Sequence, residues 1–128
     1  MNKFLILLIF LISPFSLYAS DVYYCSDDAV TGFNVKLNYE PARYQTEKFK
    51  MKIDFEKKEI VSKELAFSSR DRQKCFFGHM NYILYCSNDL GGAFSINKRT
   101  LEFHRSSVFL VSNQSDDIFI AHGSCEKF

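Results

Sequence analysis

The chain has 128 residues, of which 47% are hydrophobic and 16% aromatic, and it carries 16 basic and 15 acidic side chains. The high apolar content argues against a disordered chain, and the length fits one ordinary domain. The near balance of charge argues against a nucleic-acid binder or a polybasic membrane-surface protein, because both need a surplus of Lys and Arg.

The first segment has the pattern of a secretory signal peptide. Lys3 precedes an apolar run, Pro14 interrupts that run, and small residues then lead to Ala19. A spanning helix needs about 20 apolar residues, so the proline comes too early for a membrane anchor. We expect cleavage near Ala19, which makes residues 1–19 a signal peptide and residues 20–128 a single β-domain. No later stretch approaches spanning length, so we expect the mature chain to have no membrane span and to be periplasmic or secreted.

Apolar and polar residues alternate along much of the chain after the signal, and this period of two is typical of β-strands. Residues 22–24 form a short aromatic strand in this interpretation, and residues 31–37 form a second one. Residues 38–47 contain a proline and show little periodicity, so we expect a loop there, with or without a helical turn. The residues that the alternation turns inward in the second strand are Phe33, Val35 and Leu37.

The clearest strand begins at residue 48, where Phe49 opens a run of alternate apolar residues with charged residues between them. One register therefore buries every apolar group of the run and leaves the charges in water. The run continues into residues 53–60, whose order of apolar, polar and basic positions returns at residues 94–101. Both segments predict hairpins with short charged tips.

The second half of the chain contains further strand signals. Residues 61–72 are ambiguous, since their apolar residues fit either the end of a strand or the start of a short helix. Residues 74–77 and 82–86 flank a turn and predict another hairpin. The apolar runs at residues 108–111 and 118–121 predict the last strands. The chain as a whole therefore predicts an all-β fold, a small antiparallel β-barrel or sandwich of about 7–8 short strands.

Four cysteines follow the expected signal, and an even count in a small exported domain is typical of two disulfides. Three pairings are open to four cysteines, and the sequence by itself does not choose between them. We favour Cys25 with Cys125, because both lie near the ends of the mature chain and chain termini are often neighbours. Cys75 and Cys86 lie eleven residues apart, a separation that one hairpin bridges. In the chain-entropy model the Cys25–Cys125 bridge contributes about 4–5 kcal/mol to stability, and the Cys75–Cys86 bridge contributes somewhat under about 3 kcal/mol.

Two other uses of the cysteines compete with this interpretation. A zinc site usually contains closely spaced ligand pairs, and the chain has no Cys-x-x-Cys and no His-x-x-x-His. A redox or catalytic thiol needs a Cys-x-x-Cys motif or an unpaired cysteine. We therefore favour structural disulfides and expect no metal and no other cofactor. The histidines available to a zinc site are His79, His104 and His122.

The sequence contains no motif for catalysis: there is no Gly-rich phosphate loop, no nucleophile elbow and no His-Glu-x-x-His. Two acidic pairs, Asp27–Asp28 and Asp116–Asp117, have the oxygen donors that calcium prefers. Aspartate is also a common turn residue, and both pairs fall where turns are expected. His104 alternates with the apolar Phe103, which predicts a surface position. We therefore assign no catalytic, cofactor-binding or metal-binding residue and expect that the protein is not an enzyme.

The layout of the two ends is similar to that of the small periplasmic inhibitors of C-type lysozyme. Tyr24 and Cys25 are followed by acids, a β-rich middle comes next, and Cys125 closes the layout. Those inhibitors carry a Ser-Gly-x-Gly run in their inhibitory loop, and this chain lacks that run. The resemblance implies inhibition of a secreted hydrolase as an alternative function and transfers no site residue.

Three classes of function remain open after these exclusions. We expect a non-catalytic binding or interaction module, because the sequence combines a disulfide-tied β-scaffold with no catalytic motif. Its partner is then a protein or another component of the envelope, and not a nucleic acid. The alternatives are an inhibitor of a secreted hydrolase such as lysozyme, and a small enzyme with no recognisable motif.

Overall fold

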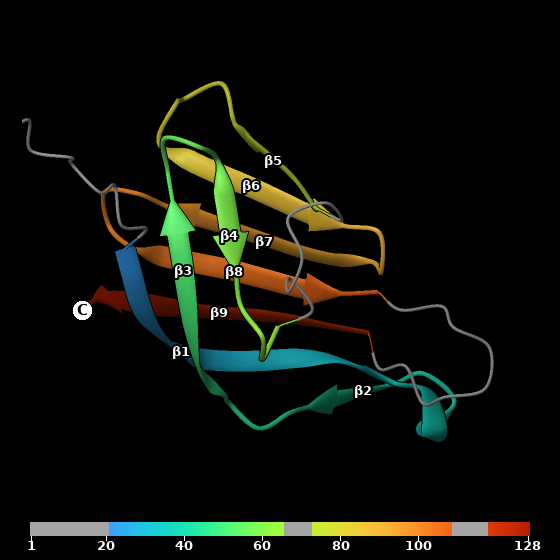
Figure 1. Ribbon diagram of the computed structural model, residues 1–128. Coiled ribbons are helices and arrows are strands. Elements are labelled where there is room, and N and C mark those ends of the chain that lie inside the picture. The colour runs from blue at the N-terminus through green and yellow to red at the C-terminus, as the bar shows by residue number, and fades with distance from the viewer. Residues whose placement is uncertain (1–20, 66–72, 109–117) are drawn as a thin grey trace, which may run out of the picture.

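Antiparallel strands dominate the protein. The computed structural model describes residues 21–65, 73–108 and 118–128, and its strands form one sheet that curls into a nearly closed barrel (Figure 1). The predicted signal peptide and the pair Asp116–Asp117 lie outside the described residues. Within the described ranges, no helix has the length and apolar character needed to cross a membrane. The prediction of an all-β, disulfide-stabilised barrel or sandwich is confirmed.

Nine strands and one short helix make up the described part. The elements are β1 (Asp21–Asn34), the 3-10 turn η2 (Val35–Leu37), β2 (Glu40–Arg43), β3 (Lys48–Asp54), β4 (Glu59–Val61), β5 (Gln73–Phe77), β6 (Ile83–Asn88), β7 (Gly92–Asn97), β8 (Glu102–Ser107) and β9 (Ile118–Lys127). The order across the sheet is β4-β3-β1-β9-β8-β7-β6-β5, and β2 pairs with the second half of β1. Figure 1 shows β3 and β4 crossing the β6–β8 layer at a steep angle.

Hairpins join most neighbouring strands, as their sequences predict. The two segments with similar sequence form the β3–β4 and β7–β8 hairpins, and each has its charged tip in a turn. Residues 74–77 and 82–86 form the β5–β6 hairpin. The predicted loop at 38–47 is wrong in part, because residues 40–43 form β2 and pair with β1.

The core forms on the inner face of the curled sheet, where alternate side chains of the strands meet. Phe49, Met51 and Ile53 of β3 are at most 4% exposed, whereas the lysines between them face solvent. The ring of Phe103 stacks on that of Phe94 at 5.3 Å between centroids and meets the edge of Phe49 at 5.4 Å. Large aromatic and aliphatic side chains therefore fill the space between the crossing layers.

A β-bulge in β1 explains why the inward position predicted for Phe33 is wrong. Asp27 pairs with Gly123 of β9 and Ala29 pairs with His122, so Asp28 is an extra residue with no partner. One extra residue moves every later side chain to the opposite face. Phe33 is consequently 45% exposed, and Leu37, beyond the end of the strand, is 54% exposed. The side chain of Val35 lies outside what the structure describes.

Both disulfides join residues that lie directly opposite each other on neighbouring strands. Cys25 of β1 is bonded to Cys125 of β9, with 4.0 Å between their Cα atoms. Cys75 of β5 is bonded to Cys86 of β6, with 4.1 Å between theirs. This is the pairing that chain position favours, and it leaves no free cysteine in the described residues.

Side chains close the barrel where β4 and β5 face each other without a backbone ladder. The amide of Gln73 donates from Nε2 to the carbonyl of Ile60 (2.6 Å) and accepts the Ile60 N–H at Oε1 (3.3 Å). One glutamine thus takes the place of a peptide group from a neighbouring strand. Beyond the end of β4, Glu64 accepts the Lys50 N–H (2.7 Å) and Ser62 donates to the Lys50 carbonyl (2.9 Å). These bonds satisfy backbone groups that would otherwise be unpaired.

Replacing Gln73 tests this closure. Gln73→Ala is expected to lower the free energy of unfolding by about 1–3 kcal/mol, because it leaves two backbone groups of the fully buried Ile60 without partners. Urea denaturation measures the change. Lys74→Ala, on the next and solvent-exposed residue, is the matched control, with an expected change within about 0.5 kcal/mol. Equal effects of the two variants would contradict a role of Gln73 in closing the barrel.

Candidate functional site

A buried ion pair lies inside one end of the barrel. Arg105 of β8 donates from Nε to Oδ1 of Asp27 (3.0 Å) and from Nη2 to Oδ2 of Asp27 (2.5 Å). Nη2 also donates to Oε2 of Glu47 (2.9 Å). The Asp27 side chain is completely buried and that of Arg105 is 7% exposed, whereas the Glu47 side chain is 63% exposed. Two carboxylates therefore hold the arginine, one from inside and one from the surface.

The local fold positions each member of this group. Asp27 is the last inward-facing residue of β1 before the bulge, and its backbone N–H donates to the Glu47 carbonyl (2.9 Å). Its Oδ2 also accepts the Glu47 N–H (3.0 Å), which fixes the chain just before β3. The guanidinium carbon of Arg105 lies 5.5 Å from the ring centre of Phe49 and 5.0 Å from that of Phe119. The faces of aromatic rings suit a planar cation.

Charge compensation keeps Arg105 protonated. Burial by itself lowers the pKa of Arg105, but the hydrogen bonds and negative charges of Asp27 and Glu47 outweigh it, so its pKa lies above the ordinary value. A guanidinium held in this way keeps its positive charge and does not act as a general acid. The main role of the ion pair is therefore structural.

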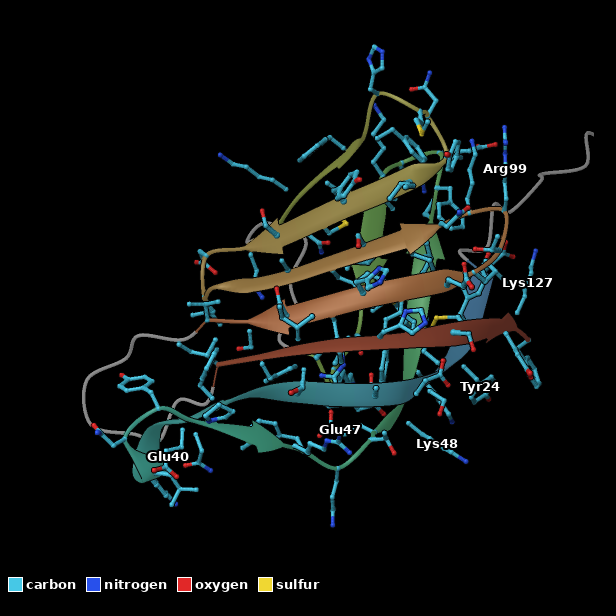
Figure 2. All side chains as sticks on the ribbon, turned by 180° about the vertical axis from the view of Figure 1, so that it is seen from behind. Tyr24, Glu40, Glu47, Lys48, Arg99 and Lys127 are labelled. Atoms are coloured by element: carbon cyan, nitrogen blue, oxygen red, sulfur yellow. A yellow bond between two sulfur atoms is a disulfide. The ribbon has the colours of Figure 1, made fainter. Side chains whose placement is uncertain are left out.

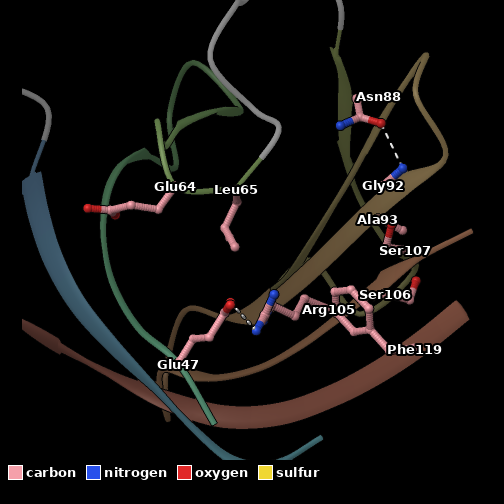
Figure 3. Close-up of a pocket in the computed structure, with 10 residues that line it drawn as sticks. All are labelled: Glu47, Glu64, Leu65, Asn88, Gly92, Ala93, Arg105, Ser106, Ser107 and Phe119. Atoms are coloured by element: carbon pink, nitrogen blue, oxygen red, sulfur yellow. Dashed lines mark hydrogen bonds and ion pairs between the residues drawn. The ribbon is translucent and has the colours of Figure 1, made fainter. Parts of the chain in front are cut away.

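A pocket of about 280 Å³ opens beside the ion pair. Figure 3 shows Glu64 and Leu65 on one wall, and Arg105 and Phe119 on the other. The pocket is also lined by Glu47, Asn88, Gly92, Ala93, Ser106 and Ser107. Asn88 Oδ1 accepts the Gly92 N–H (2.7 Å) and so braces the turn that forms the rim. Two charged residues of the lining already have partners: Glu64 accepts the Lys50 N–H, and Arg105 is held by Asp27 and Glu47.

A second concavity lies on the outer face of the sheet, and we call it the outer groove. It spans β5 to β9, has a volume of about 390 Å³ and is mainly apolar. Phe76 and Tyr85 form one rim, with their rings stacked at 5.7 Å, and Ile120 and His104 form the other. Small residues form the floor between the rims: Ser87, Ala93, Ser95 and Ser106. Figure 2 shows this outer face of β6–β9 turned toward the reader, with β3 and β4 behind it.

The apolar side chains on the rims are exposed to solvent. Phe76 is 58% exposed, Ile120 60% and Tyr85 39%. The register places them in adjacent rows of one face: Phe76 lies opposite Tyr85, and the next row runs through Ala93 and Ser106 to Ile120. Apolar groups that gather in this way on a surface mark interaction sites more often than single exposed ones do.

Two of the three histidines come together beside this groove. His104 of β8 and His122 of β9 lie directly opposite each other, with 4.9 Å between their ring centroids. Asp28, the extra residue of the bulge, places Oδ2 3.9 Å from His122 Nε2. His79 lies elsewhere, exposed in the β5–β6 turn. The surface position predicted for His104 is confirmed.

The expectation that Asp27 and Asp28 lie in a turn is wrong. Both residues lie within β1, where Asp27 faces the inside of the barrel and Asp28, the extra residue of the bulge, faces outward. They therefore have different neighbours and do not act as a pair of calcium ligands. Across the described residues, no group of three or more His, Cys, Asp or Glu side chains is arranged to hold a metal ion.

Arg105 and Glu47 are not among the residues that sequence motifs indicate as functional. The alternation that puts His104 on the surface also puts Arg105 on the same face as the fully buried Phe103. A charged residue at an inward position predicts a buried partner, because an unpaired charge in a core is strongly destabilising. That signal was present in the sequence, although it does not identify Asp27 as the partner.

Comparisons with known proteins add no relationship. The chain matches no protein-family model, no curated protein and no solved structure.

Removing the buried carboxylate tests the structural role of the ion pair. Asp27→Asn is expected to lower the free energy of unfolding by about 3–5 kcal/mol, because it leaves the Arg105 charge buried without its inner partner. Glu47→Gln removes the exposed partner of the same guanidinium, and its expected effect is under about 1 kcal/mol. Urea unfolding of both variants provides the comparison. If Asp27→Asn is no more destabilising than Glu47→Gln, the inner carboxylate does not hold the arginine as described.

Proposed function

We propose that this protein is an exported, non-catalytic binding module that uses the outer groove to hold an apolar segment of a partner protein. The observation that carries the proposal is the exposure of Phe76, Tyr85 and Ile120 around a floor of small residues. Burying such side chains against a partner is favourable by about 25 cal/mol per Å² of apolar surface. Water otherwise covers this surface at a cost in free energy.

The shape of the groove supports a protein partner over a small ligand. Small-molecule sites are usually concave enough to enclose most of the ligand. The outer groove lies on the outside of the sheet, while the interior is filled by side chains such as Phe94, Phe103 and Met51. A shallow apolar strip between two rims fits a side chain or a short extended segment that a second protein presents.

Rigidity of the scaffold also supports a binding role. The Cys75–Cys86 bond ties β5 to β6 under the rim formed by Phe76 and Tyr85. The remaining strands of the face are held by ladders on both sides. A surface that is ordered before binding loses less conformational entropy when the partner arrives.

Two disulfides support an exported location, because such bonds persist in oxidising compartments and are rare in the cytosol. The partner is therefore to be sought in the periplasm or outside the cell. Arg105 does not supply a catalytic group in this proposal, since Asp27 and Glu47 occupy its Nε and Nη2 donors.

Site-specific photocrosslinking in the producing cell tests the groove. A photoreactive residue at Ala93, on the exposed floor, is expected to give a discrete adduct with one partner, and the same residue at Ser124, on the same outer face outside the groove, is not. The adduct identifies the partner, whose binding is then measured with the two purified proteins.

Groove variants complete the test. Tyr85→Ser combined with Ile120→Ser is expected to weaken binding of the purified partner at least about tenfold, which corresponds to 1.4 kcal/mol. Tyr24→Ser removes an apolar side chain that is 42% exposed near the start of β1 and serves as the matched control. Adducts of equal yield from Ala93 and Ser124, or equal binding by the groove and control variants, would falsify the proposal.

The hydrolase-inhibitor alternative is tested with the same variants. A stoichiometric inhibition curve against a secreted hydrolase that is lost in Tyr85→Ser/Ile120→Ser would make that hydrolase the partner. Inhibition that survives in this variant would place the contact outside the outer groove.

A further inference from the structure

The two facing histidines occupy a favourable position for sharing a ligand. The β8–β9 register, continued one residue before β8, places Leu101 opposite Cys125, and the Cys125 N–H donates to the Leu101 carbonyl (2.9 Å), so this position is a hydrogen-bonded pair. Hydrogen-bonded and non-hydrogen-bonded pairs alternate along antiparallel strands. His104 and His122, three steps along, are therefore a non-hydrogen-bonded pair. Side chains approach each other most closely at such pairs, with Cβ atoms about 4.5–5.5 Å apart.

The surroundings leave room beside the two imidazoles. On its other side His104 faces Ser95 of β7, and His122 faces Ala29 of β1. Both of these neighbours are small, so no bulky side chain covers the pair from the adjacent strands. His122 has 45% of its side chain exposed, and His104 is also exposed.

Negative charge lies next to the pair. Asp28, the extra residue of the bulge, faces outward, and its Oδ2 lies 3.9 Å from Nε2 of His122. Glu102 lies two residues before His104 on the same exposed face of β8. Carboxylates near a site lower the energy of a bound cation. No lysine or arginine shares the rows of the ladder that contain the two histidines from β7 to β1.

We propose that His104 and His122 form a binding site for one late first-row divalent metal ion, with Cu²⁺ held most tightly. Imidazole nitrogen suits Cu²⁺, Ni²⁺ and Zn²⁺, and affinity among divalent ions of the first row is greatest for Cu²⁺. Metal-bound imidazole nitrogens lie about 2.0–2.1 Å from the ion. Rings whose centroids are 4.9 Å apart need only side-chain rotation to bring one nitrogen each to a common ion.

The protein supplies two ligands in this proposal, since the described residues contain no group of three or more suited to a metal. Water completes the coordination, which leaves positions open to a donor from another molecule. The site also borders the outer groove, because His104 lines its rim. The inference does not rest on the proposed function, since the histidine pair binds metal whether or not the groove binds a protein.

Copper titration of the purified exported protein tests the site. Isothermal calorimetry with Cu²⁺ in a competing glycine buffer is expected to show one ion per chain. His104→Ala and His122→Ala are each expected to weaken binding about 100-fold, because the second imidazole otherwise binds intramolecularly. His79→Ala, at the third histidine of the chain, is the matched control and is expected to change the affinity by less than about twofold, since that residue lies outside the pair.

Electron paramagnetic resonance of the parent protein gives a readout that needs no variant. Two equivalent imidazole nitrogens are expected in the superhyperfine pattern of the bound Cu²⁺. The proposal is overturned by a spectrum with a single nitrogen or only oxygen ligands, or by unchanged copper affinity in His104→Ala/His122→Ala. Because both side chains are exposed, unchanged thermal unfolding of the variants is expected and separates loss of the site from loss of the fold.

Discussion

The single extra residue in β1 is the constraint on which much of the structure depends. Before Asp28 the inward-facing residues are Tyr23, Cys25 and Asp27, and after it the next one is Val30. The inward-facing positions of β1 therefore change from odd to even residue numbers at the bulge. Both halves of the strand turn residues inward in this way, the half that pairs with β3 and the half that pairs with β2. Without the bulge, the buried Val30 would turn to the outer face and Phe33 to the inner one.

Glycine opposite the bulge makes this geometry possible. A Cβ atom at Gly123 would lie 2.1 Å from the Ser26 carbonyl oxygen and 2.7 Å from the Phe103 ring. Only the absence of a side chain lets β9 approach β1 so closely while Phe103 fills the core beneath. Acidic residues at the bulge lie on opposite faces: Asp27, just before it, meets Arg105 inside, and Asp28, the extra residue, lies beside His122 outside.

The buried ion pair does not need to add stability to be important. Taking a guanidinium and a carboxylate out of water is unfavourable, and good hydrogen-bond geometry recovers much of that loss. The pair does make wrong registers of β1 against β9 unfavourable, because a shift by one residue would leave Arg105 buried without Asp27. The aromatic rings of Phe49 and Phe119 add to this selection, since they accept the cation only in one place.

Local patterns in the sequence determined the strands, while contacts between distant strands decided the sites. Alternation predicted the inner face of β3 and the β3–β4 and β7–β8 hairpins, because strand period and turn formation depend on neighbouring residues. The even number of cysteines predicted two disulfides, and the hairpin predicted around residues 78–81 agreed with a bond between Cys75 and Cys86. These features need no knowledge of which strand lies beside which.

The tertiary structure alone decided the bulge, the ion pair and the histidine pair. Asp27 and Arg105 are 78 residues apart, and His104 and His122 belong to strands separated by a long connection. Their contacts depend on the register between β1, β9 and β8, which the sequence pattern of one strand does not specify. The bulge also changed the face of Phe33, because the phase of a strand is set by its partner as well as by its own alternation.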